Sequence, residues 1–325
     1  MSKVDASGWG HARVTILRCA ASDMNVSGPW LFWSDSPSLT LRDSLERHGQ
    51  LLPVLVDASG ARPVLVAGAG RAAVLAELGR DVLCLDLGAL SDEARGLAYV
   101  QSNADRELTD GHMVTALRYF LSLPECDMTP VLDALGLDAR SKRMRLLRSW
   151  LRLPRRWDRH LWSGAVPLAC ADLLEKFDRD DLEAVESLFD NLSWSRGNAV
   201  NVLTWIREIS ARDGISVAGV FDGAQVGDIL AGGFSPKDAM SRVTQGVRVL
   251  RYPALSGMER EFQEAARAVS AGTRWKVAQP DMFESDAVEL SVRLTSPDDL
   301  RAASAELARI AAREDLDGLF CAGRK

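Results

Sequence analysis

The 325-residue chain contains few residues of the kinds that form metal centres, disulfide frameworks and many catalytic sites. Its five cysteines and four histidines are scattered, and no CxxC pair or His-Cys cluster occurs. An odd, scattered set of cysteines indicates reduced thiols in a cytosol and argues against a zinc site or a disulfide framework. The GxSxG and HExxH motifs are also missing, so the sequence predicts no catalytic residues and no metal site.

Long apolar runs are missing as well. The sequence has no stretch of 18 or more apolar residues, and its first residues lack the cationic start and apolar core of a signal peptide. We therefore expect a cytoplasmic protein with no membrane partner. Hydrophobic residues make up 47% of the sequence, which is ordinary for globular proteins, and the length is sufficient for two or three domains.

Glycine and proline divide residues 44–79 into short elements. A helix that ends at Gly49 and an irregular turn at Pro53 precede the apolar run Val54–Val56, which predicts a strand. Val64–Val66 predicts a second strand. The expected order is therefore helix, turn, strand and strand.

Gly68 and Gly70 lie between the second strand and an amphipathic helix, Arg71–Leu78, which is expected to end at Gly79. Glycines at the start of a helix allow backbone N–H groups to approach an anion, and Arg71 adds positive charge. The segment therefore has the pattern of a phosphate-binding loop. A plain tight turn between strand and helix explains the same glycines and stays open as the alternative.

These segments resemble the N-terminal domain of the ParB family of chromosome and plasmid partition proteins, which includes KorB-like and Noc-like relatives. The first sequence box of that family is matched by Ser44, Leu45, Gly49, Gln50 and Pro53. The second box is matched by Gly68, Arg71 and Gly79, and the third corresponds to Ser102–Leu108. The resemblance implies an N-terminal α/β domain of the ParB and sulfiredoxin type at residues 1–125.

The same resemblance implies a site for CTP with Mg²⁺. At the positions of the three boxes the nucleotide-binding residues would be Gly49, Gln50, Gly68, Gly70, Arg71, Asn103 and Arg106. The chain departs from the family at Ala69, Gly70 and Ser102, where the family has Glu, Arg and Glu. Because a magnesium-triphosphate site uses carboxylate oxygens, these departures predict a weak CTPase or none. CTP with Mg²⁺ is thus a candidate cofactor and not a requirement.

One short segment is strongly basic although the whole chain carries a net charge of −6. Residues 138–160 hold nine arginine and lysine residues against two aspartates, a net charge of +7. A concentrated basic stripe on an acidic protein is typical of contact with a phosphate backbone, although a solvated face of a packing helix gives the same pattern. The segment is therefore a candidate nucleic-acid interface.

The order of elements around the stripe favours DNA binding. Thr129 and Pro130 predict the start of a helix that ends at Gly136, and a basic second helix is expected over Arg140–Leu151. This is the pattern of a helix-turn-helix, and the ParB resemblance continues through it to imply an all-helical domain at residues 126–213. The candidate DNA-binding residues are Arg140, Ser141, Lys142, Arg143, Arg145 and Arg148.

The C-terminal third has a different pattern. Residues 214–245 hold six glycines and predict a linker, with a short helix starting at Ser235–Lys237. Residues 246–325 predict the order β-α-β-β-α-β, with strands at 247–252, 275–278, 287–294 and 318–321 and helices at 258–271 and 296–312. This order suggests a small ferredoxin-like α+β domain, and we expect it to form a homodimer.

The expected fold class is α+β, with an N-terminal ParB/sulfiredoxin-like domain, a central helix-turn-helix domain and a small C-terminal domain. This organisation favours a sequence-specific duplex-DNA-binding protein that acts in plasmid partition, chromosome segregation or transcriptional regulation. Nucleoid or plasmid association and a partner ATPase are implied by the resemblance. Two alternatives stay open: a CTP-binding switch or CTPase clamp on DNA, and an interaction adaptor that binds neither ligand.

Overall fold

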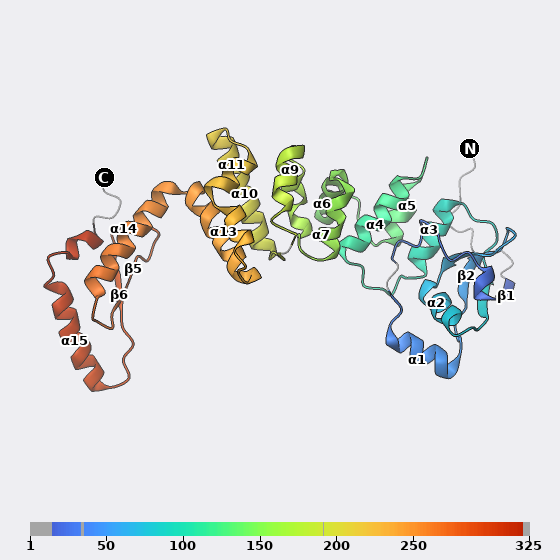
Figure 1. The fold of residues 1–325 in the computed structure, drawn as a ribbon, viewed down its shortest axis with the longest axis horizontal. Helices are drawn as coiled ribbons and strands as arrows, with labels where there is room; N and C mark the ends of the chain where they lie inside the picture. Colours follow the sequence, from blue (N-terminus) through green and yellow to red (C-terminus); the bar gives the residue numbers. More distant parts are fainter. Residues whose placement is uncertain (1–14, 34–35, 191, 321–325) are drawn as a thin grey trace. The chain divides into compact units, whose positions relative to one another are not determined.

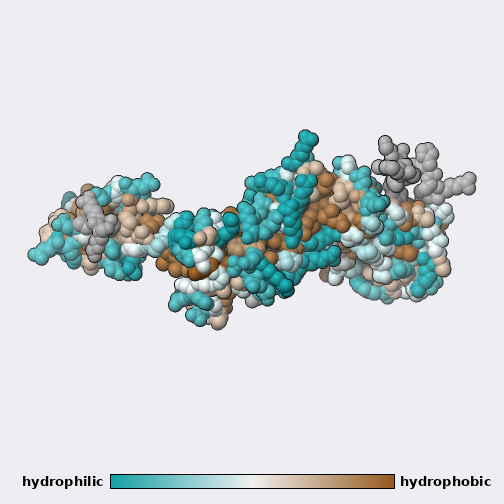
Figure 2. Space-filling view, turned by 90° about the horizontal axis from the view of Figure 1, so that it is seen from above, coloured by the Kyte–Doolittle hydropathy of each residue, from teal (hydrophilic) through white to brown (hydrophobic). Residues whose placement is uncertain are grey.

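The computed structural model describes residues 15–33, 36–190 and 192–320. The chain divides into two compact units, Met1–Leu203 and Thr204–Lys325. Hydrophilic residues predominate on the face shown in Figure 2, with apolar residues in patches between them. Among the described residues no helix is long and apolar enough to span a membrane.

The first unit begins with a small mixed sheet and its helices (Figure 1). The elements are β1 (Thr15–Cys19), the 3-10 helix η2 (Ala21–Asp23), α1 (Leu39–His48), β2 (Val54–Asp57), β3 (Val64–Ala67), α2 (Ala69–Glu77), β4 (Val82–Asp86) and α3 (Asp92–Gln101). The strand order is β1-β4-β2-β3, with β2 parallel to β4 and the other two pairs antiparallel. Helix α2 packs against β2 and β4, and α3 packs against β3.

The predicted strands at residues 54–56 and 64–66 are confirmed, and so are the two glycine helix ends. Gly49 has a φ of 72° after α1, and Gly79 has a φ of 62° after α2. These angles suit glycine because a side chain would be strained there. Helix α2 begins at Ala69, two residues earlier than predicted, so its first turn includes Gly70 and Arg71.

A buried carboxylate joins the sheet to α3. Asp57, at the end of β2, is 2% exposed. Burial by itself would raise the pKa of this carboxyl, but hydrogen bonds from Ser59, Arg95 and the Leu90 amide outweigh burial and lower the pKa to about 2. The ionised carboxylate therefore holds the first turn of α3 against the sheet at neutral pH.

The rest of the first unit is helical. Its elements are α4 (Asp110–Leu121), α5 (Met128–Ala134), α6 (Lys142–Arg152), η3 (Arg155–Trp157), α7 (Asp158–Trp162), η4 (Leu168–Cys170), α8 (Ala171–Leu174) and α9 (Arg179–Glu186). Helix α10 (Arg196–Asp213) begins in this unit and ends in the second. The two helices predicted around Gly136 are present as α5 and α6.

The capping residues of these two helices differ from the predicted ones. Asp127, and not Thr129, caps α5, because its carboxylate accepts a hydrogen bond from the Thr129 N–H. Ser141 caps α6 by accepting from the Met144 N–H, so Arg140 lies in the turn before the helix. Gly136 has a φ of 64° and reverses the chain between the helices.

Trp150 anchors α6 in the unit. Its side chain is fully buried, and its indole N–H donates to Asp158 Oδ1 at 3.0 Å. Arg118 of α4 binds the same carboxylate, with Nε 2.6 Å from Oδ2. A buried indole with a satisfied N–H and a shared acceptor fixes α6 relative to α4 and α7.

The second unit is mainly helical, and two predictions made for its sequence are wrong. Its elements are α11 (Val217–Gly223), α12 (Val226–Ala231), α13 (Pro236–Arg251), α14 (Pro253–Ser270), β5 (Lys276–Ala278), β6 (Glu289–Ser291), α15 (Pro297–Ala311) and η5 (Leu316–Leu319). The predicted linker 214–245 is wrong, because these residues form α11, α12 and most of α13. The predicted helix start at Ser235–Lys237 is confirmed, since Ser235 caps α13 and Pro236 is its first residue. The predicted strand 247–252 is also wrong, because it continues α13, in which Ala239, Val243 and Val247 are buried at helical spacing.

The C-terminal part of this unit has the order α-β-β-α. Strands β5 and β6 pair antiparallel, and α14 packs against β5 and η5. The ferredoxin-like order is therefore wrong, since helix and 3-10 turn replace its first and last strands. Cys321, the end of the predicted last strand, lies outside the described residues. Ser296 caps α15 as predicted, accepting from the Asp299 N–H.

Candidate nucleic-acid interface and phosphate-binding cavity

A cavity of about 410 Å³ lies at the N-terminus of α2. It is lined by Trp33, Ser36, Pro37, Ser38, Leu41, Leu52, Gly68, Ala69, Gly70, Arg71, Tyr99, Asn103 and Arg106. The structure thus brings together five candidate nucleotide-binding residues from two distant segments, the start of α2 and the turn after α3. These two segments lie close together because α3 packs against β3, which is an edge strand of the sheet.

Glycine at the start of α2 is required by the close approach of its neighbours. Gly68 has a φ of 98°, and a Cβ there would lie 2.9 Å from Val54 Cγ1. A Cβ at Gly70 would lie 3.3 Å from Leu41 Cδ2. The first-turn N–H groups of a helix have no partners within the helix, and the helix dipole favours an anion beside them. The backbone here is therefore suited to hold a phosphate.

Two guanidinium groups add positive charge to this cavity. Burial lowers the pKa of Arg71, whose Nη1 donates to the Leu52 carbonyl oxygen at 3.4 Å. Arginine nevertheless stays protonated in proteins. The guanidinium of Arg106 lies 6.0 Å from the centre of the Trp33 ring. A ligand with several phosphate oxygens would meet both charges and the amides of α2.

The side chains of Asn103 and Ser102 form hydrogen bonds with the backbone at the end of α3. The Asn103 Nδ2 donates to the Tyr99 carbonyl oxygen at 2.8 Å, and the Ser102 hydroxyl donates to the same oxygen at 2.9 Å. No Asp or Glu is among the described residues that line the cavity. The donor set therefore fits phosphate and does not fit Mg²⁺, which prefers carboxylate oxygens.

Gly49 and Gln50, the other two candidate residues, do not line the cavity. Gly49 ends α1. The Gln50 side chain bridges to β4, because its Nε2 donates to the Leu83 carbonyl oxygen at 2.8 Å and its Oε1 accepts from the Leu83 N–H at 2.6 Å. Its amide thus continues the sheet hydrogen bonding instead of facing a ligand.

Five of the six candidate DNA-binding residues lie at the N-terminal end of α6 or in the turn before it, and Arg148 lies in the middle of the helix. Arg140 is exposed in the preceding turn, and Ser141 is the N-cap. Lys142, Arg143, Arg145 and Arg148 are all exposed. Since α-helices have 3.6 residues per turn, Arg145 and Arg148 share one side of α6, whereas Arg143 lies on the opposite side from Arg145.

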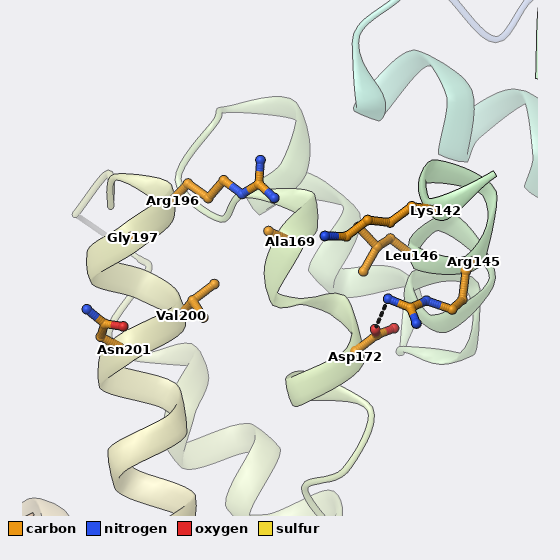
Figure 3. Close-up of a pocket in the computed structure, with 9 residues that line it drawn as sticks. All are labelled: Lys142, Arg145, Leu146, Ala169, Asp172, Arg196, Gly197, Val200 and Asn201. Atoms are coloured by element: carbon orange, nitrogen blue, oxygen red, sulfur yellow. Dashed lines mark ion pairs between the residues drawn. The ribbon is translucent and has the colours of Figure 1, made fainter.

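A second cavity, also of about 410 Å³, lies beside α6. In Figure 3, Lys142 from α6 and Arg196 from the start of α10 extend toward the space between the two helices. Asn201 lies further along α10, and Asp172 of α8 binds Arg145 at 3.2 Å. The lining of this cleft is Lys142, Arg145, Leu146, Ala169, Asp172, Arg196, Gly197, Val200 and Asn201.

Arg196 and Asn201 were not among the residues that the sequence predicted for DNA contact. They lie outside the basic stripe, and only the packing of the helices brings Arg196 near Lys142. The one sequence signal was the position of Arg196 at the first turn of a helix that follows Ser195. The cleft therefore widens the basic surface beyond α6.

Several arginines of the stripe are held in ion pairs within the unit. Arg143 Nη2 lies 2.6 Å from Asp110 Oδ1, and Arg152 binds Glu175. By contrast, the structure shows no ion pair for Lys142 or Arg148 with any described residue. These two side chains are available to an external anion.

The chain shows weak likenesses to solved structures, of which 14 chains match it. No protein-family model and no curated protein matches the chain. The C-terminally truncated chromosome-partitioning protein ParB from Caulobacter crescentus, complexed to the centromeric parS site, is 14% identical, with a TM-score of 0.35, over 70% of this chain and 99% of that chain. The same truncated protein complexed with CTP-gamma-S is 18% identical, with a TM-score of 0.23, over 53% and 97% of the two chains.

Proposed function

We propose that this protein binds duplex DNA in a sequence-specific manner and acts in replicon partition or in transcriptional regulation. The observation that carries the proposal is the exposed basic surface of α6, on which Lys142 and Arg148 lack described ion-pair partners. Arg196 extends toward the cleft that Lys142 lines. Cations gathered on one surface of an acidic chain favour a local phosphate partner.

The elements around α6 support insertion into a groove. Helix α5, the turn at Gly136 and the Ser141-capped α6 follow in the order of a helix-turn-helix. In that motif the N-terminal residues of the second helix reach base edges in the major groove. Lys142 and Arg143 occupy those positions, and arginine forms paired hydrogen bonds with guanine.

Selection of bound fragments from random and genomic duplex DNA tests this proposal. The full-length chain should enrich one short sequence, and the enrichment should shrink in a Lys142→Ala/Arg148→Ala variant that still folds. Recovery of unselected fragments only would overturn sequence-specific binding. The genomic positions of the enriched sequence would then distinguish the two roles. Sites clustered on one replicon would indicate partition, and sites at promoters would indicate transcriptional regulation.

We propose as a second function that the α2 cavity binds CTP and that the nucleotide acts as a switch on DNA binding. Five candidate residues line this one cavity, and its amides and arginines fit phosphate oxygens. Because the described lining has no carboxylate to fix a metal and a water, hydrolysis should be slow or absent. The structure therefore favours a binding switch over an active CTPase.

Calorimetric titration of the full-length chain with CTP, ATP and GTP, with and without Mg²⁺, tests the switch. The Arg71→Ala variant should bind CTP about 10- to 100-fold more weakly, since a charge-assisted hydrogen bond contributes about 1.5–3 kcal/mol. Arg18→Ala, an exposed arginine on β1, is the matched control and should bind normally. If no nucleotide gives a heat of binding, the loop is a simple turn and the proposed nucleotide site is wrong. Rapid CTP hydrolysis would contradict the prediction that a cavity lining without carboxylates hydrolyses CTP slowly or not at all.

We also propose that the second unit forms a homodimer through α15. Leu300 and Leu307 of this helix are 54% and 38% exposed and lie two turns apart on one side. Exposed apolar rows of this kind are typical of helix pairing. An interaction adaptor that binds neither DNA nor nucleotide would share this surface, so the dimer alone does not decide between the functions.

Light scattering tests the dimer. At tens of micromolar, a concentration sufficient for ordinary homodimers, the full-length chain should have twice the monomer mass. The Leu300→Asp/Leu307→Asp variant should be monomeric, whereas Leu39→Asp, which places a charge at an 80%-exposed leucine of α1, should stay dimeric. A monomeric parent chain would sink this proposal.

A further inference from the structure

We propose that Asp110 and Asp172 are positioning residues that hold two α6 arginines in the DNA-free protein, so that duplex DNA must displace these carboxylates to bind. The inference rests on the proposed function, since it assigns a role to residues of the same interface. It concerns two aspartates that lie outside α6 and flank it on opposite sides.

The first pair joins α6 to α4. Arg143 Nη2 and Nε lie 2.6 Å and 3.0 Å from the same oxygen, Asp110 Oδ1. The side chains of Arg143 and Asp110 are 44% and 35% exposed, so water and solutes reach both. Asp110 occupies the first position of α4, where the helix dipole favours a negative charge. The helix dipole and the ion pair therefore hold the Asp110 carboxylate in place beside Arg143.

The second pair joins α6 to α8 on the opposite side. Arg145 Nη2 lies 3.2 Å from Asp172 Oδ2, and Figure 3 shows this pair at the wall of the cleft that Lys142 and Arg196 also line. Arg145 is 64% exposed, so the guanidinium remains accessible to an external anion. One arginine on each side of α6 is thus occupied by a carboxylate of a neighbouring helix.

Carboxylate and phosphate compete for the same donors. Both accept paired N–H bonds from the planar guanidinium, so a DNA phosphate or guanine edge that uses the donors facing the aspartate would replace it: Nε and Nη2 of Arg143, and Nη2 of Arg145. Exposed ion pairs contribute little, and displacement is therefore readily reversible. After displacement, the freed carboxylate stays near the DNA and repels it.

This arrangement separates two classes of cation on one helix. Lys142 and Arg148, which have no ion pair with the described residues, can meet DNA without losing an internal partner. Arg143 and Arg145 must exchange an aspartate for a DNA acceptor. They therefore add to the DNA-binding free energy only where DNA offers a better acceptor than the aspartate. Non-specific duplexes would then gain less from these two arginines than the correct site does.

The test measures duplex affinity of the full-length chain by fluorescence anisotropy at about 150 mM salt. Asp110→Asn and Asp172→Asn should each tighten binding by about two- to fivefold, the range expected from the strength of an exposed ion pair. Asp180→Asn changes the charge equally at an exposed position of α9 and is the matched control. It should leave affinity unchanged.

A double-mutant cycle distinguishes displacement from general repulsion. In an Arg143→Ala background Asp110→Asn should no longer tighten binding, and in an Arg145→Ala background Asp172→Asn should no longer do so. Gains that persist without the arginines, or no gain in either aspartate variant, would overturn the inference. A parent chain that binds no duplex at all would instead overturn the proposed function. Thermal unfolding of each variant shows that the effect is not a change in stability.

Discussion

Replacing Arg143 and Arg145 together with alanine is expected to weaken binding to the selected duplex by at least about thirtyfold, because each lost phosphate or base contact costs about 1–3 kcal/mol. The two arginines lie on opposite sides of α6. Both can contact DNA only when the helix end enters a groove, whereas a helix lying flat on the backbone would use one side. The double variant therefore tests the geometry as well as the charge.

The matched control removes two exposed arginines that do not belong to α6. Arg179→Ala/Arg207→Ala lowers the net charge by the same amount, at exposed positions of α9 and α10. Its affinity should stay within about threefold of the parent chain, since distant charges are largely screened at physiological salt. If both double variants lose affinity equally, binding depends on overall charge and α6 has no special role.

The Trp150→Ala variant is expected to lose about 3–5 kcal/mol of unfolding free energy in the first unit, as fully buried aromatic residues do when truncated. The side chain is completely buried, and its indole N–H is bonded to Asp158. Because Arg118 binds the same carboxylate, the truncation also loosens the attachment of α6 to α4. Chemical denaturation monitored by circular dichroism measures this loss.

Trp150→Phe separates packing from hydrogen bonding. Phenylalanine keeps most of the buried surface but removes the indole donor, so we expect a smaller loss of about 1–3 kcal/mol. An alanine variant that is as stable as the parent would show that α6 is not anchored by this residue. DNA binding by the phenylalanine variant should be retained, since the exposed arginines are unchanged.

The two helices and two strands between residues 44 and 79 could be predicted because glycine and proline mark their ends, whereas β1, β4 and α3 were not predicted. Gly49 and Gly79 have positive φ angles that few other residues adopt, so the helix ends follow from the sequence. The strand order β1-β4-β2-β3 could not be predicted, because pairing depends on contacts between segments that no local pattern encodes.

The α13 region shows why short alternating patterns mislead. Residues 247–249 alternate between apolar and charged side chains, as a half-buried strand does, but Leu250 breaks the alternation. The same residues continue a helical row that begins at Ala239 and includes Val243 and Val247, all of them buried. A longer stretch of sequence that includes Ala239 favours the helix. The glycines of residues 214–233 suggested a linker, but they do not prevent the formation of α11 and α12.

The candidate sites were predicted in part. The family resemblance predicted Gly68, Gly70, Arg71, Asn103 and Arg106 as nucleotide-binding residues, and all five line one cavity. The sequence did not reveal that Gln50 pairs with the Leu83 backbone, or that Asp110 and Asp172 bind α6 arginines. These partners are about 30 residues apart, so only the folded chain brings them together.

The most direct test of sequence-specific DNA binding compares the affinity of the full-length chain for the selected duplex and for a scrambled duplex of equal length, at about 150 mM salt. We expect the selected duplex to bind about 10³-fold or more tightly than the scrambled one, as sequence-specific proteins do. Equal affinity for the two duplexes, or no binding to either, would contradict the account.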